Sequence, residues 1–147
     1  REIYLKAFEM IVKDENPWAI MSSYNMINGY RASESEDLLT GILRDEWGYE
    51  GMVTSDWWTC GEHYKETKAG NDLKMGNGYP DRVKKAYDKG AISRSEMETS
   101  VKRIFSSALC KPTRFIIPDT YYKKKTDMQN CHVRFCICIS SIINSVF

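Results

Sequence analysis

Apolar side chains recur at helical spacing over the first part of the chain, and a proline follows them. The spacing predicts an amphipathic helix over residues 1–16, because side chains three and four positions apart share one face of a helix. Pro17 disfavours helical geometry in the residue before it and so ends this helix. An apolar run over residues 18–25 then turns polar and leads to an Asn-Gly pair at 28–29. The run predicts a buried strand with a loop after it.

Two later helices begin with the same pair of residue types, a serine followed three positions later by a glutamate. Ser33 with Glu36, and Ser93 with Glu96, each predict a capping box, in which the two side chains accept hydrogen bonds from free backbone amides of the first turn. Gly48 ends the first of these helices. The apolar residues at helical spacing are Leu38, Leu39, Ile42, Leu43 and Trp47 after the first pair, and Met97, Val101, Ile104 and Ala108 after the second.

Between these helices the sequence predicts a second buried strand and three further elements. The strand covers residues 51–54, a short helix covers 63–69, a strand-like segment covers 72–75, and a helix over 80–89 ends at Gly90. This alternation of helices and strands predicts an α/β fold with a parallel sheet. A complete (β/α)₈ barrel of the TIM type needs about 250 residues, so we expect a partial barrel of three or four βα units.

Polar and aromatic residues follow the two strands at their carboxyl ends. Asp56, Trp57 and Trp58 come directly after the strand over 51–54, and Tyr24 lies at the end of the strand before it. Parallel α/β sheets bind ligands at this edge. Indole rings cover the apolar faces of a sugar, and carboxylates and phenols bind its hydroxyl groups, so the group is consistent with a saccharide site. Two ordinary interpretations stay open, the aspartate as a turn former and the tryptophans as core residues.

Composition and charge narrow the classes of function. Apolar residues make up 42% and charged residues 28% of the 147 residues, which is typical of a soluble globular protein. The formal net charge of +1 indicates no nucleic-acid partner, and the most apolar stretch, residues 135–147, is too short for a membrane span. Cys60, Glu62 and His63 with His132 fit no common zinc spacing, and no glycine-rich phosphate loop is present. We therefore expect neither a metal nor a cofactor.

The character of the chain changes after residue 111. Residues 112–147 contain no glycine or tryptophan and show no sustained period, which predicts an irregular, poorly ordered tail. The tail is either an out-of-frame or read-through extension or a variable connector to another domain. At the other end, Arg1 lies inside a helical pattern without an initiator methionine, so we expect a preceding segment, and both a cytoplasmic and a secreted location stay open.

Two stretches carry motifs in a specific order, WAIMSSYNMINGYRASESEDLLTGILRDEWGYEGMVTSDWW over residues 18–58 and AGNDLKMG over residues 69–76. They resemble glycoside hydrolase family 3, the β-glucosidase family, and the resemblance extends over about residues 1–111. It implies that this region is the C-terminal part of the family's N-terminal (β/α)₈ barrel, meaning its last three or four βα units. It also implies retaining hydrolysis of terminal β-linked sugars, with a β-linked saccharide or glycoside as the substrate.

The resemblance assigns roles to individual positions. Asp56 matches the catalytic nucleophile, and Trp57 matches the aromatic wall beside it. Tyr24 matches a tyrosine that contacts the nucleophile, and Met21 matches a methionine that lines the same pocket. Asp72 is expected to be structural and to hold the loop after the last strand. In most family members the general acid/base comes from a later α/β domain or a mobile loop, and further sugar-binding residues come from earlier strands. The resemblance therefore implies that these residues lie outside this chain.

Two functions stay open from the sequence. The chain is part of the catalytic barrel of a retaining β-glucosidase, or it is a non-catalytic, truncated remnant without the acid/base and most sugar-binding residues. A partial barrel also leaves unpaired sheet edges, which favour self-association.

Other side chains receive structural interpretations. Trp58 is expected to pack behind the site. Glu46 is expected to pair with Arg44 or with another surface residue. Arg44, Trp47 and Tyr49 are expected to hold their helix to the sheet.

Overall fold

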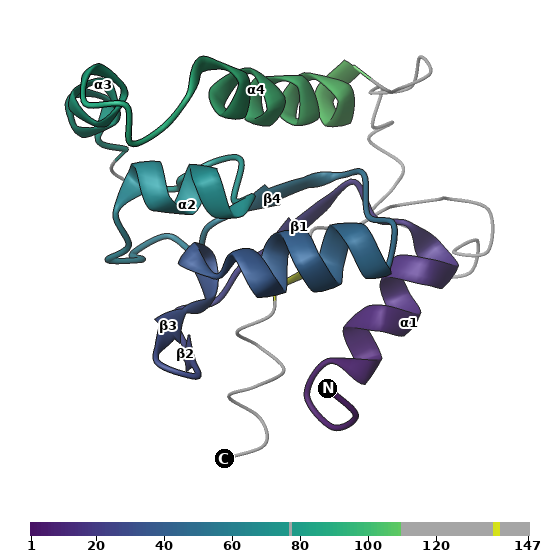
Figure 1. The fold of residues 1–147 in the computed structure, drawn as a ribbon. Helices are drawn as coiled ribbons and strands as arrows, with labels where there is room; N and C mark the ends of the chain where they lie inside the picture. The colour runs from purple at the N-terminus through teal and green to yellow at the C-terminus, as the bar shows by residue number, and fades with distance from the viewer. Residues whose placement is uncertain (77, 110–136, 139–147) are drawn as a thin grey trace, which may run out of the picture.

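The computed structural model describes residues 1–76, 78–109 and 137–138 (Figure 1). The elements in chain order are α1 (Lys6–Glu15), β1 (Ala19–Met21), β2 (Met26–Ile27), β3 (Tyr30–Arg31), η1 (Ala32–Glu34), η2 (Asp37–Glu46), β4 (Met52–Thr54), α2 (His63–Ala69), α3 (Pro80–Asp88), α4 (Arg94–Leu109) and β5 (Ile137–Cys138). In the view of Figure 1, β1 and β4 lie at the centre, with α3 and α4 above them and α1 and η2 below them.

The main sheet is parallel and has the order β4-β1-β5. Strand β1 pairs with β4 in the register Ala19 to Met52 and Met21 to Thr54. Leu73 adds a parallel bridge to Thr54, within the segment over 72–75 that was predicted to be strand-like. Helices that connect parallel strands make this a mixed α/β fold, as predicted. The number of barrel units stays a prediction.

The core lies where α1 and η2 pack against β1 and β4. Ile20, Leu39 and Val53 are at most 1% exposed and form its centre. Each such side chain contributes about 1.5–3 kcal/mol through burial of apolar surface. The buried cluster consists of Phe8, Val12, Ile20, Ala32, Leu38, Leu39, Leu43, Tyr49, Val53 and Ala69.

The first helix and the first strand are both shorter than predicted. Helix α1 starts at Lys6 and ends in a left-handed residue, Asn16, whose amide donates to the carbonyl of Val12 at 3.1 Å. After β1 the chain forms a β-hairpin, β2 and β3, instead of the predicted loop. Asn28 and Gly29 both have positive φ, 51° and 85°, which suits a tight hairpin turn whose twist matches that of its strands.

One predicted capping box is wrong and the other is confirmed. Ser33 points into the protein, where its hydroxyl donates to Glu66 at 2.8 Å, and Ser35 instead accepts from the amide of Leu38 at 3.3 Å. The helix that follows, η2, is a π-helix. At α4, the Ser93 amide donates to the Glu96 carboxylate at 2.6 Å and the Glu96 amide donates to the Ser93 hydroxyl at 3.2 Å.

The cap of α4 predicts the effect of a single substitution. Ser93→Ala removes the acceptor for the Glu96 amide and is expected to lower the free energy of unfolding by about 1 kcal/mol. Urea denaturation followed by circular dichroism measures this change. Ser106→Ala, at an exposed position inside the same helix, is the matched control and is expected to be neutral or to stabilise by up to about 0.5 kcal/mol, because alanine has the higher helix propensity. Equal effects of the two substitutions would contradict the assignment of the cap.

The predicted tail over 112–147 lies outside the described residues except for β5. Ile137 and Cys138 pair in parallel with Ile20 and Met21. One edge of β1 therefore carries a strand of the same chain. Unpaired sheet edges and self-association stay predictions. Among the described residues, no helix combines the length and the apolar character that crossing a membrane requires.

Candidate active site

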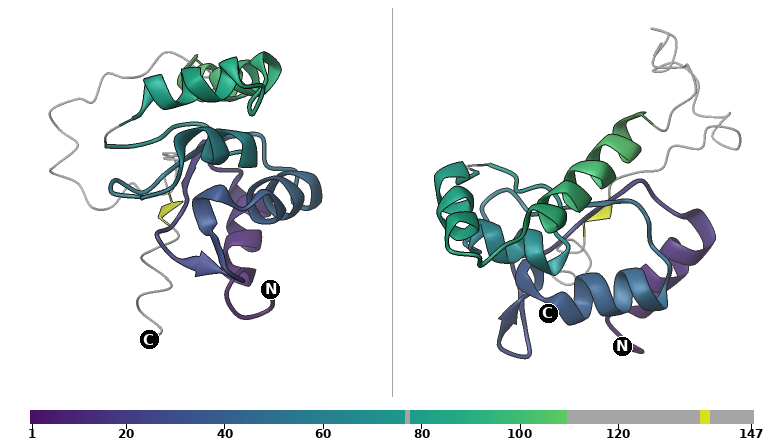
Figure 2. Two further views of the ribbon diagram at one scale, coloured as in Figure 1. Left: turned by 60° about the vertical axis from the view of Figure 1, so that its left-hand side comes forward. Right: turned by 45° about the horizontal axis from the view of Figure 1, so that its top comes forward.

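Strands β1 and β4 end together, and this brings two predicted site residues to one edge of the sheet. The amide of Ser22 donates to the carbonyl of Thr54 at 2.8 Å, and Met21 lies opposite Thr54 in the register. Asp56 follows Thr54 by two residues, so Met21 and Asp56 stand at the ends of neighbouring strands. The views in Figure 2 show β1 and β4 side by side. The parallel pairing explains this proximity, because parallel strands present their carboxyl ends at the same edge.

Asp56 is partly buried and is held in the loop that leaves β4. One of its carboxylate oxygens accepts the amide of Trp57 at 2.6 Å. Its carbonyl accepts the hydroxyl of Ser55 at 2.9 Å, and that hydroxyl in turn accepts the amide of Met75 at 2.9 Å. The Asp56 carboxylate therefore stabilises the turn in which it lies, as expected if the residue is a turn former. The loop in turn holds Asp56 at the end of β4.

Tyr24 and the two tryptophans surround this turn. The Tyr24 hydroxyl accepts the amide of Trp58 at 2.9 Å, so the tyrosine contacts the loop that carries Asp56. Trp57 is 51% exposed and Trp58 is 69% exposed, and their rings meet edge to face with centroids 6.4 Å apart. The prediction that Trp58 packs behind the site is wrong. Two small polar residues, Ser55 and Thr59, fill the buried positions of this loop instead.

The segment after α2 supports the loop from the other side. Asn71 accepts the hydroxyl of Ser22 at 2.9 Å and donates to the carbonyl of Leu73 at 3.2 Å, which ties the segment to the end of β1. Gly76 has a φ of +67° and passes so close to the Trp57 carbonyl that a Cβ atom at this position would collide with it. Only glycine fits here without displacing the Trp57 backbone.

Asp72 is structural, as predicted. It forms a buried ion pair with Arg44 at 2.8 Å. Its carboxylate also accepts hydrogen bonds from the amide of Val53 at 2.9 Å and from the guanidinium of Arg103 at 3.2 Å. Burial raises the pKa of Asp72 above its ordinary value, and the positive charge of Arg44 opposes this shift. Arg44 holds its helix to the strands, because it also donates to the backbone carbonyls of Tyr49, Gly51 and Gly70.

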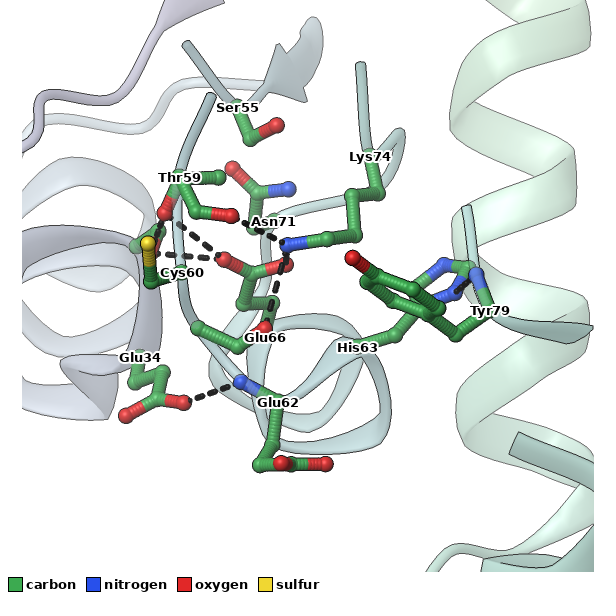
Figure 3. A network of polar contacts seen from close by, with 12 residues as sticks. Glu34, Ser55, Thr59, Cys60, Glu62, His63, Glu66, Asn71, Lys74 and Tyr79 are labelled. Carbon is green, nitrogen blue, oxygen red and sulfur yellow. Dashed lines mark hydrogen bonds and ion pairs between the residues drawn. The ribbon is translucent and has the colours of Figure 1, made fainter. Parts of the chain in front are cut away.

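Two further charged residues lie under the loop, and the sequence analysis missed both. Glu66 on α2 and Lys74 after it form an ion pair of 2.7 Å, with side chains 0% and 2% exposed (Figure 3). The available signal was a lysine inside a short segment that was predicted to be strand-like. The spacing of residues in the sequence could not identify the partner of Lys74, because Glu66 lies on a different element.

The remaining candidates do not contribute to the site. Glu46 forms an exposed ion pair with Arg1 at 2.6 Å, so its partner is a surface residue other than Arg44. His63 accepts the amide of Tyr79 at 3.2 Å, and burial lowers its pKa. Within the described ranges, no three histidine, cysteine or acidic side chains come together as a metal would require. His132 lies outside those ranges.

Comparison with known proteins gives consistent results. Residues 1–107 match the family model of the glycosyl hydrolase family 3 N terminal domain. Beta-glucosidase A of Butyrivibrio fibrisolvens is 60% identical over 110 residues, which are 75% of this chain and 13% of that protein. An exo-alpha-(1->6)-L-arabinopyranosidase of Bifidobacterium breve is 44% identical over 99 residues, or 67% of this chain and 13% of that protein.

Solved structures show the same likeness. The beta-glucosidase 3B of Thermotoga neapolitana, solved in complex with glucose, matches with a TM-score of 0.71 and 37% identity over 74% of this chain and 17% of that one. The chain thus spans about an eighth of the length of the two relatives named above. With the family model matched over residues 1–107 and the fold shared with a solved member, the chain belongs to glycosyl hydrolase family 3.

Proposed function

We propose that this chain forms part of the active site of a retaining β-glucosidase, with Asp56 as the nucleophile. The observation that carries the proposal is the placement of Asp56, a partly buried carboxylate at the end of β4 and next to two exposed indole rings. A carboxylate can attack an anomeric carbon, and the indole faces can cover the apolar face of the sugar.

The reaction takes place in two steps. Asp56 attacks the anomeric carbon, the glycosidic bond breaks, and a general acid protonates the leaving oxygen, which gives a glycosyl ester on Asp56. The same group then removes a proton from water, water attacks the anomeric carbon, and the ester bond to Asp56 breaks. Each step inverts the configuration at the anomeric carbon, so the released sugar has the configuration of the substrate. The general acid/base, expected about 5–5.5 Å from the nucleophile, comes from a part of the protein outside these residues.

The other site residues have supporting roles in this proposal. Trp57 covers one face of the sugar beside the nucleophile. Tyr24 holds the loop through the Trp58 amide and brings its hydroxyl close to the turn at Asp56. Met21, opposite Thr54 at the end of β1, forms an apolar part of the pocket floor.

The names of the relatives define the substrates to test. Most of the named relatives are β-glucosidases, while one group is named for an exo-acting L-arabinopyranosidase. We take a β-glucoside as the expected substrate, because Beta-glucosidase A of Butyrivibrio fibrisolvens shares 60% of the aligned residues. An aryl α-L-arabinopyranoside is the competing substrate to include.

A segment graft tests the proposal. Residues 1–109 replace the matching segment of about 110 residues in the Butyrivibrio fibrisolvens enzyme. The remainder of that enzyme is expected to supply the rest of the barrel and the acid/base. We expect the graft to hydrolyse an aryl β-glucoside with kcat/KM within about 100-fold of the parent. The two segments share 60% of their aligned residues, and a misplacement of about 1 Å caused by distant substitutions can cost about 100-fold. The 147-residue chain by itself is expected to show no turnover.

The unmodified parent enzyme is the control for folding and for the assay. A graft that folds, as judged by circular dichroism and a cooperative melting transition, but shows no turnover would contradict the proposal. That result would favour the alternative of a chain that no longer supports catalysis.

A further inference from the structure

The side chain of Lys74 is fully hydrogen-bonded under the loop that carries Asp56. Its ammonium group donates to the Glu66 carboxylate at 2.7 Å and to the carbonyls of Thr59 and Gly61, both at 3.1 Å (Figure 3). An ammonium group has three protons, and all three have acceptors here. Two of these acceptors are backbone atoms of the loop over residues 55–62.

The second oxygen of Glu66 binds the same loop from another direction. It accepts the hydroxyl of Thr59 at 3.1 Å and the hydroxyl of Ser33 at 2.8 Å. At Gly61 the loop runs so close to this carboxylate that a Cβ atom would collide with it. The ion pair thus connects η1, α2 and the segment after α2 to a single stretch of loop backbone.

General stability is a weak explanation for such a pair. Removing two charges from water costs several kcal/mol for each ion, and well-packed apolar residues of similar size often serve the stability of a fold as well or better. What an apolar pair lacks is the ability to bind the carbonyls of Thr59 and Gly61. These carbonyls follow Asp56 and Trp57 closely, and the Thr59 amide itself lies 3.5 Å from the Asp56 carbonyl.

We propose that the Glu66–Lys74 ion pair is a positioning device, which fixes the loop over residues 55–62 and thereby the direction of the Asp56 side chain. Both residues are positioning residues, since they act through the loop. The role of the ion pair in catalysis rests on the proposed function. Its effect on the loop is independent of that function and can be measured without substrate turnover.

Amide hydrogen exchange of the 147-residue chain, followed by mass spectrometry of peptides, tests the proposal. Lys74→Met leaves Glu66 as an unpaired buried charge and is expected to destabilise the protein generally. The informative variant is the double substitution Glu66→Leu/Lys74→Met, which removes both charges at similar side-chain volume and so restores much of the stability. In this double variant we expect exchange over residues 55–62 to accelerate by about 10-fold or more, with less than about a 2-fold change in α1 and α4, because local opening is governed by local contacts.

Two results would overturn the proposal. One is a double variant whose loop exchanges at the rate of the original chain. The other is an acceleration of equal size in the loop, α1 and α4, which would make the pair a general contributor to stability. Arg44→Met, which breaks the buried ion pair with Asp72, is the matched control and is expected to accelerate exchange in all three regions. Because exchange needs no substrate, an inactive graft would not affect either outcome.

Discussion

Asp56→Asn in the grafted enzyme is expected to lower kcat by a factor on the order of 10³ or more. An amide has nearly the size of the carboxylate but is a very poor nucleophile, so the glycosyl ester cannot form at a useful rate. The Trp57 amide can still donate to the remaining side-chain oxygen, which preserves the local turn. Steady-state hydrolysis of an aryl β-glucoside measures the effect, with circular dichroism and thermal melting to show that folding is unchanged.

Controls separate loss of the nucleophile from loss of structure. Asp45→Asn, at an exposed position of η2, removes one carboxylate away from the site and is expected to leave kcat unchanged. Asp56→Ala with added azide is expected to recover turnover of an activated aryl glucoside and to give a glycosyl azide of inverted configuration, because azide takes the place of the missing carboxylate. Activity of Asp56→Asn close to that of the unmodified graft would contradict the assignment.

Arg44→Met in the 147-residue chain is expected to lower the free energy of unfolding by about 3–5 kcal/mol. The substitution removes the Asp72 partner at 2.8 Å and leaves the buried carboxylate with Arg103, at 3.2 Å, on its other oxygen. It also removes the donor that binds the carbonyls of Tyr49, Gly51 and Gly70. Natural domains have free energies of unfolding of about 5–15 kcal/mol, so the expected loss is a large part of the total. Urea denaturation with a two-state fit gives the difference.

The control for this prediction is an exposed ion pair that also joins an arginine to a carboxylate. Arg82 pairs with Glu62 at 3.4 Å on the surface, and Arg82→Met is expected to change the free energy of unfolding by less than about 1 kcal/mol. If Arg44→Met were as mild as Arg82→Met, the buried pair would not hold η2 to the strands as described.

Local signals in the sequence were sufficient for elements whose ends are set by local chemistry. The structure has α2 at the predicted residues 63–69, where left-handed Gly70 ends the helix, and β4 lies inside the predicted strand over 51–54. The cap of α4 likewise involves two residues that are three positions apart. At such sites the determinant is contained in a few neighbouring residues, and the pattern alone identifies it.

Features that depend on distant partners were not predictable in this way. Ser33 matches a capping box as well as Ser93 does, but its hydroxyl binds Glu66, which is 33 positions away. A tertiary hydrogen bond thus replaces a local one. The same applies to Lys74, whose acceptors come from the loop after β4 and from α2. The Asn-Gly hairpin at 28–29 is different, because its signal was local and was interpreted as a loop.

In the candidate site, too, some features were predictable from the sequence and others depended on the tertiary structure. The parallel alternation of strands and helices was enough to expect Asp56, Trp57 and Tyr24 at one edge of the sheet. The exposure of Trp58 was not predictable, since it depends on which residues of the loop turn inward, and Ser55 and Thr59 take those positions.

The most direct test of the central claim is to trap the glycosyl ester on the grafted enzyme with a 2-deoxy-2-fluoroglucoside that carries an activated leaving group. Fluorine at carbon 2 destabilises the positively charged transition states, so the ester forms but hydrolyses slowly. Proteolysis and tandem mass spectrometry then locate the sugar. We predict a single labelled peptide with the fluoroglucosyl group on Asp56, and a label on any other carboxylate would contradict the assignment of the nucleophile.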